Sequence, residues 1–100
     1  MRRGSTPTYT FELPFPVVNC QKIDICFAQH KKVFVQKDKS DCVLGEGNTF
    51  SLTLTQDETL LFRANECIDV QVSVLTGNGT ALTSDIYHLD CVECLRNGVL

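Results

Sequence analysis

Cysteine and histidine residues near the carboxyl end of the chain have the types and the spacing that could do chemistry. Cys91-Val92-Glu93-Cys94 is a C-x-x-C pair, and His88 stands three residues before it. A turn that brings two thiolates and an imidazole together can hold Zn²⁺, and a C-x-x-C pair can also exchange disulfides. His88, Cys91 and Cys94 are therefore the zinc candidates of this sequence.

Several features argue against metal or redox chemistry at this motif. Positions i and i+3 of a strand project from opposite faces, so the chain must curl to bring Cys91 and Cys94 together. A structural zinc takes four ligands, and the fourth would have to come from a cysteine elsewhere in the chain. Thioredoxin-like chemistry needs the pair to begin a helix in a βαβ unit, and the pattern here is not of that kind. We therefore expect plain thiols, no metal and no cofactor, and a zinc-binding module is the least favoured function.

Patterns of catalytic residues are missing elsewhere. His30 lies in a lysine-rich turn, and Asp57 and Glu58 stand where a short helix would begin, a position at which the helix dipole favours carboxylates. Gly77-Asn78-Gly79 has the composition of a hairpin turn and lacks the strand–loop–helix order of a phosphate-binding loop. We predict that the protein is not an enzyme, and no small-molecule substrate is identified from these residues.

Composition limits the possible classes further. The chain has 100 residues, of which 43% are hydrophobic and 21% charged, as expected for one globular domain. A net charge of −3 argues against nucleic-acid partners and anionic membranes. Polar residues occupy positions 5–8, where a signal peptide would have its apolar segment, so we expect synthesis in a reducing cytoplasm. In that compartment the six cysteines should be free thiols: Cys20, Cys26, Cys42, Cys67, Cys91 and Cys94.

The elements that must position these residues are predicted to be strands, because apolar and polar residues alternate along most of the chain. The clearest run is 67–75, in which every even position is apolar and β-branched. Shorter runs lie at 11–15, 22–27, 33–35, 50–55 and 86–89. The core predicted from this alternation consists of Phe11, Leu13, Ile25, Phe27, Phe50, Leu52, Leu54, Val70, Val72, Val74 and Ile86.

Turn and cap signals complete the predicted architecture. Thr55 and Glu58 have the spacing of a capping box, which predicts a short helical turn near 56–61. Asn78-Gly79 between two apolar segments predicts a hairpin. Six or seven strands with one helical turn and no βαβ alternation are typical of an all-β fold, a single antiparallel β-sandwich with an immunoglobulin-like architecture. We expect one domain over residues 1–100, with an N-terminal arm at 1–8 and a C-terminal tail at 96–100.

Seven segments spread over nearly the whole chain resemble a family of small proteins encoded by phages and prophages of gut Firmicutes. They are 1–8 (MRRGSTPT), 11–15 (FELPF), 27–29 (FAQ), 52–59 (LTLTQDET), 72–76 (VSVLT), 79–84 (GTALTS) and 97–100 (NGVL). The resemblance implies a β-sandwich similar to the amino-terminal domains of phage baseplate upper proteins. Its residues belong to the structural framework, and the cysteine content is higher than the usual pattern of the family.

The function that the resemblance implies is that of a phage structural protein, a tail, baseplate or head–tail accessory subunit that acts by protein–protein contact. The arm and the tail are the segments expected to make these contacts, with further copies of the chain or with other phage structural proteins as partners. The protein would be made in the host cytoplasm and would then enter the virion. The alternative is a small binding module that is directed at a host protein and acts as a free monomer.

Overall fold

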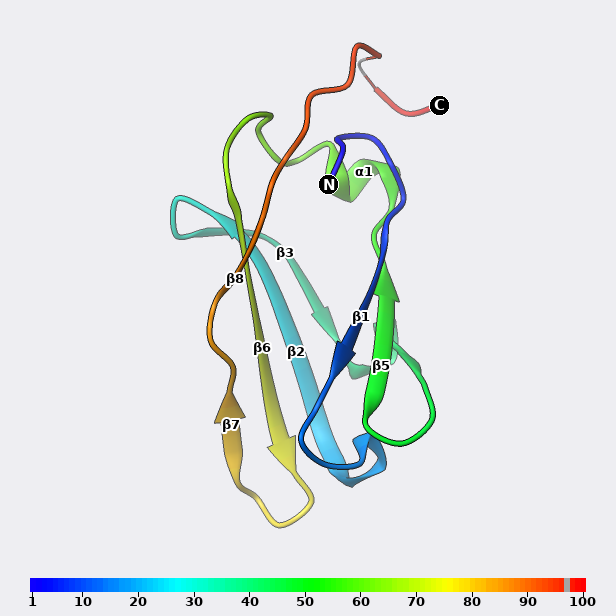
Figure 1. Ribbon diagram of the computed structural model, residues 1–100, viewed down its shortest axis with the longest axis vertical. Helices are drawn as coiled ribbons and strands as arrows, with labels where there is room; N and C mark the ends of the chain where they lie inside the picture. Colours follow the sequence, from blue (N-terminus) through cyan, green and yellow to red (C-terminus); the bar gives the residue numbers. More distant parts are fainter. Residues whose placement is uncertain (97) are drawn as a thin grey trace.

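Two antiparallel β-sheets face each other in the computed structural model, which describes residues 1–96 and 98–100 (Figure 1). Asn97, part of the predicted tail, lies outside the described residues. The elements are β1 (Thr8–Glu12), η1 (Val17–Asn19), β2 (Cys20–Gln29), β3 (Lys32–Asp38), η2 (Lys39–Asp41), β4 (Val43–Leu44), β5 (Thr49–Thr53), α1 (Gln56–Thr59), β6 (Ile68–Thr76), β7 (Ala81–Thr83) and β8 (Tyr87–Leu89).

The smaller sheet has the order β1-β5-β4, and the larger has the order β3-β2-β6-β7, with β8 also paired to β6. All of these strand pairs are antiparallel. β7 and β8 follow one another along the same edge of β6, β7 beside 73–75 and β8 beside 68–70. The described chain is therefore mostly β and sandwich-like, as the alternating pattern predicted.

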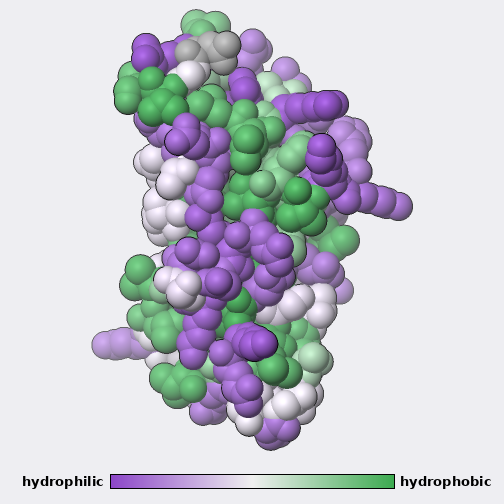
Figure 2. Space-filling model, turned by 180° about the vertical axis from the view of Figure 1, so that it is seen from behind, coloured by the Kyte–Doolittle hydropathy of each residue, from purple (hydrophilic) through white to green (hydrophobic). Residues whose placement is uncertain are grey.

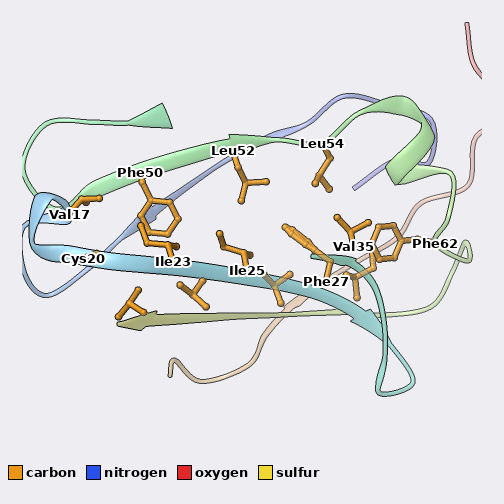
Figure 3. Close-up of a cluster of buried hydrophobic side chains, with 14 of the residues drawn as sticks. Val17, Cys20, Ile23, Ile25, Phe27, Val35, Phe50, Leu52, Leu54 and Phe62 are labelled. Atoms are coloured by element: carbon orange, nitrogen blue, oxygen red, sulfur yellow. The ribbon is translucent and has the colours of Figure 1, made fainter. Parts of the chain in front are cut away.

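The core lies between the two sheets, where the apolar faces of their strands meet (Figure 3). Phe50, Leu52 and Leu54 point from the β5 side toward Ile23, Ile25 and Phe27 of β2. Eight of the eleven predicted core residues are buried, namely Ile25, Phe27, Phe50, Leu52, Leu54, Val70, Val72 and Val74. Phe11 and Leu13 are half-buried and pack against the core, and Ile86 is exposed.

The exposure of Ile86 corrects the prediction that it belongs to the core. Its side chain is 51% exposed because Ile86 lies between β7 and β8, where the chain leaves the β6 ladder. The pairing register along β6 shifts by one residue across this break, since Val74 faces Leu82 but Val70 faces Tyr87. A one-residue shift exchanges the two faces of a strand, which alternation alone does not reveal.

The number of strands also differs from the prediction, with eight in the described chain instead of six or seven. The additional ones are short: β4 has two residues and β7 has three, and all five are exposed. The predicted strand at 11–15 is displaced toward the amino terminus and becomes β1, Thr8–Glu12. Pro14 follows its end, as expected for a residue without a backbone N–H donor.

The predicted helical turn is confirmed as α1, and both halves of its capping box form. Thr55 Oγ1 accepts from the Glu58 N–H, and the Glu58 carboxylate accepts from the Thr55 N–H. The same carboxylate pairs with Lys37 Nζ of β3 at 2.5 Å. Burial alone would raise the pKa of Glu58, but the hydrogen bonds from Lys37 and Thr55 outweigh it and lower the pKa. This ion pair ties α1 to the edge of the larger sheet.

The two long hairpins use different turns. The β6–β7 hairpin has Gly77-Asn78-Gly79 at its tip. Gly79 N–H donates to Thr76 O and closes the turn, and Gly79 has a φ of +88°. The β2–β3 hairpin has only His30 and Lys31 between the paired Gln29 and Lys32. Both turn residues have positive φ, 51° and 65°, which is the geometry of a type I′ turn.

Replacing Lys31 with glycine is expected to stabilise the fold by about 0.5–1 kcal/mol, because a non-glycine residue in the left-handed region costs roughly 1–2 kcal/mol and glycine loses part of this gain as chain entropy. Urea unfolding followed by far-UV circular dichroism measures the change. Lys31→Ala is the control, since it removes the same charge but keeps the Cβ atom. An equal gain in both variants would mean that charge, and not backbone strain, limits this turn.

Candidate functional site

His88 does not meet Cys91 and Cys94 in a cluster; it lies beside Cys67 and Asp69. In residues 1–96 and 98–100, Cys67, Asp69 and His88 are the one group of three potential metal ligands whose donor atoms all lie within 4.8 Å of one another. Cys91 is instead buried in the core, and Cys94 is half-buried beyond the last strand. The predicted zinc set is thus divided between two places.

The strand geometry explains why these three side chains meet. Cys67 immediately precedes β6 and Asp69 lies two residues later, so the two point to the same face of the sheet. Ile68 and Val70 point to the opposite face and are buried. His88 of β8 is the register partner of Asp69 and therefore lies directly beside it.

Their donor atoms converge on one point. His88 Nδ1 lies 2.8 Å from Asp69 Oδ1 and 3.6 Å from Cys67 Sγ, and the Sγ–Oδ1 distance is 3.9 Å. A Cys–His–Asp catalytic triad would use one ring nitrogen for the thiol and the other for the carboxylate. Here both contacts are made by Nδ1, so the imidazole cannot relay a proton between the thiol and the carboxylate.

Four of the other five cysteines, Cys20, Cys26, Cys42 and Cys91, have environments that disfavour the thiolate form. All six are free thiols. Burial raises the pKa values of Cys20, Cys42 and Cys91. Burial, the hydrogen bond to Asp24 and the charge of that carboxylate raise the pKa of Cys26 to about 11. Because the thiolate is the reactive form, these four cysteines are poor nucleophiles at neutral pH.

The signal that sequence reasoning missed is the pair Cys67 and Asp69. Both occupy odd positions of the run 67–75, and its alternation predicts only that these positions face away from the core. A thiol and a carboxylate at i and i+2 of a strand lie on one face of the sheet, so this spacing within a predicted strand could have indicated the pair. His88 lies nineteen positions after Asp69, and only the pairing of β8 with β6 brings it there.

A second feature is an apolar groove of about 680 Å³ between the edge of the smaller sheet and the β7–β8 side of the larger one. In Figure 1, β1 is the strand of its sheet that lies toward β6 and β7. Its apolar lining includes Tyr9, Phe11, Leu13, Val72, Leu82 and Leu89. Phe11 and Leu13 are only half-buried because they line this groove.

The backbone of β1 carries unpaired hydrogen-bonding groups along the groove. β1 pairs with β5 alone in the described part of the chain. Pro7 O accepts from Leu54 N–H and Leu13 N–H donates to Asn48 O, so the odd-numbered positions face β5. Backbone groups alternate in direction along a strand, and those of Thr8, Thr10 and Glu12 therefore point to the open edge.

β3, an edge strand of the larger sheet, carries charged side chains that β1 largely lacks. β3 carries Lys32, Lys37 and Asp38, and charged side chains on an edge strand hinder the addition of another strand. Glu12 is the one charged residue of β1. The charged residues of β3 are therefore of the kind that protects a sheet edge from the addition of another strand.

The predicted N-terminal arm lies against α1 and the loop that follows it. Arg3 Nε donates to Phe62 O at 2.6 Å, and its Nη2 donates to Leu60 O at 3.0 Å. The buried Thr59 hydroxyl donates to Ser5 O and accepts from Gly4 N–H. Residues 3–5 of the predicted arm are therefore held by hydrogen bonds to α1 and the loop after it.

The C-terminal segment exposes apolar side chains. Leu95 and Leu100 are almost fully exposed, and Val99 is about half exposed. Figure 2, which views the molecule from behind, shows hydrophobic side chains at the end of the molecule where this segment lies. Arg96 adds a positive charge to the segment.

Comparisons of the chain with protein-family models, curated proteins and solved structures gave no match. Among the described residues, none of the helices has the length and apolar character that a membrane span requires.

Proposed function

We propose that the protein is a structural subunit of a phage or prophage particle and that it assembles by protein–protein contact along β1. The observation that carries this proposal is the unprotected edge of β1 beside an apolar groove. The assignment to a phage particle rests on the resemblance of the sequence to small phage proteins. We also propose that the two sheets form a sandwich with immunoglobulin-like topology. In this proposal the protein acts as a binding subunit and not as an enzyme.

The occupant of the groove is the C-terminal segment of a second copy of the chain. Its exposed Leu95, Val99 and Leu100 offer apolar side chains to an apolar groove. Arg96 of the segment is complementary in charge to Glu12 at the groove. An extended segment there would add a strand to β1 and would pair with the backbone groups of Thr8, Thr10 and Glu12.

Substitution of Thr10 by proline is expected to abolish self-association. Proline removes the Thr10 N–H, which points to the open edge, and leaves the hydrogen bonds between β1 and β5 in place. Sedimentation velocity over a range of concentrations measures the association. Thr10→Val is the matched control, because it keeps the backbone N–H and should still associate. A wild-type chain that stays monomeric at every concentration would contradict assembly between copies.

The particle itself is tested by mass spectrometry of virions purified after prophage induction. Stoichiometric presence in the particles supports the structural role. Absence from particles together with co-purification of one host protein would favour the alternative, a monomeric module directed at that protein.

A further inference from the structure

We propose that Cys67, Asp69 and His88 form a Zn²⁺ site, with one thiolate, one carboxylate and one imidazole as ligands. The three donor atoms lie on the solvent-facing side of the larger sheet, at the pairing of β6 with β8. This site is different from the predicted set of His88, Cys91 and Cys94, with which it shares only His88.

The distances among the donor atoms are close to those of a tetrahedral zinc site. Bond lengths of about 2.3 Å to sulfur and 2.0–2.2 Å to nitrogen and oxygen place tetrahedral ligand atoms about 3.4–3.6 Å apart. The Sγ–Nδ1 distance of 3.6 Å agrees with this value, and the Sγ–Oδ1 distance of 3.9 Å is slightly longer. The Nδ1–Oδ1 distance of 2.8 Å is that of a hydrogen bond, which the metal would replace by a small opening of the pair.

The donor set selects the class of metal. Thiolate and imidazole suit Zn²⁺, whereas Mg²⁺ and Ca²⁺ prefer oxygen ligands. Cys67 and His88 are exposed, so a metal ion reaches the site directly from solvent. Three protein ligands leave the fourth tetrahedral position to water or to a group from a partner.

A metal at this site would fasten β8 to β6. β8 has only three residues, and its described strand partner is β6 alone. Cys67 and Asp69 belong to the β6 side and His88 to β8, so one ion would bridge two segments that are distant in sequence. Zinc that binds the folded chain and not the unfolded one raises the unfolding temperature.

Titration of the reduced protein with Zn²⁺ in a calorimeter tests the site, and Co²⁺ titration tests its ligands through the visible absorption of a tetrahedral thiolate complex. We expect one ion per chain and a raised unfolding temperature. Cys67→Ser, Asp69→Asn and His88→Asn should each weaken binding at least about 10-fold, the lower limit for loss of a supporting group around a metal. Circular dichroism shows whether each variant is folded.

Two controls separate this site from other thiols and histidines. His30 pairs with Glu66 at 3.3 Å, and the exposed fractions of the two side chains, 72% and 34%, nearly equal the 67% and 34% of His88 and Asp69. His30→Gln and Cys94→Ser should therefore leave Zn²⁺ binding unchanged. Binding that survives Cys67→Ser, or that is lost in Cys94→Ser, would overturn the assignment, and so would the absence of binding in the wild-type chain.

Discussion

Phe27→Ala is expected to lower the free energy of unfolding by about 3–5 kcal/mol, the usual cost of deleting a buried phenylalanine ring. Phe27 is 1% exposed and lies on β2, between β3 and β6. Its ring meets the Tyr9 ring of the smaller sheet edge to face, with centroids 6.0 Å apart. The change leaves a cavity between the sheets and removes this aromatic contact. Small domains have only about 5–15 kcal/mol of stability, so a large part of it would be lost.

Urea unfolding followed by far-UV circular dichroism measures this loss, with two comparisons. Phe27→Leu keeps most of the side-chain volume and should cost less. Phe15→Ala makes the same deletion at a half-buried residue and should also cost less than Phe27→Ala. Equal losses at Phe15 and Phe27 would be incompatible with a core centred between the two sheets.

Gln29→Leu is expected to destabilise the fold by about 2–4 kcal/mol, because buried polar groups without partners cost roughly 1–3 kcal/mol each. Gln29 is 1% exposed and holds the loop between α1 and β6 with its amide group. Its Nε2 donates to Arg63 O at 2.9 Å and to Glu66 O at 3.2 Å, and its Oε1 accepts from Arg63 N–H at 2.7 Å. Leucine has a similar volume but leaves all three backbone groups unpaired.

The contribution of the amide is isolated by Gln29→Glu and by Gln36→Leu. Glutamate still accepts from Arg63 N–H but cannot donate to the two carbonyls, so Gln29→Glu should also be strongly destabilising. Gln36 is exposed on β3, and Gln36→Leu should change stability by no more than about 0.5 kcal/mol. If Gln29→Leu lowers the free energy of unfolding no more than Gln36→Leu does, water forms the hydrogen bonds to the loop backbone in place of the glutamine.

The sequence alone determined the local elements, because their causes are local. Alternation over 67–75 predicted β6, in which Ile68, Val70, Val72 and Val74 are buried. The capping box of Thr55 and Glu58 predicted α1, and Asn78-Gly79 predicted the β6–β7 hairpin. Each of these depends on the period of a strand, on the first hydrogen bonds of a helix or on the backbone freedom of glycine, all of which are set within a few residues.

Only the tertiary structure decided which segments lie side by side, because strand pairing joins residues that are far apart in the chain. The one-residue shift between β7 and β8 turned Ile86 outward. Docking of Arg3 on the carbonyls after α1 placed the predicted arm within the fold. The pairing of β8 with β6 places the donor atom of His88 beside those of Cys67 and Asp69, and not in a cluster with Cys91 and Cys94. Metal-ligand geometry depends on distances in space, and a pairing register fixes those distances where sequence spacing cannot.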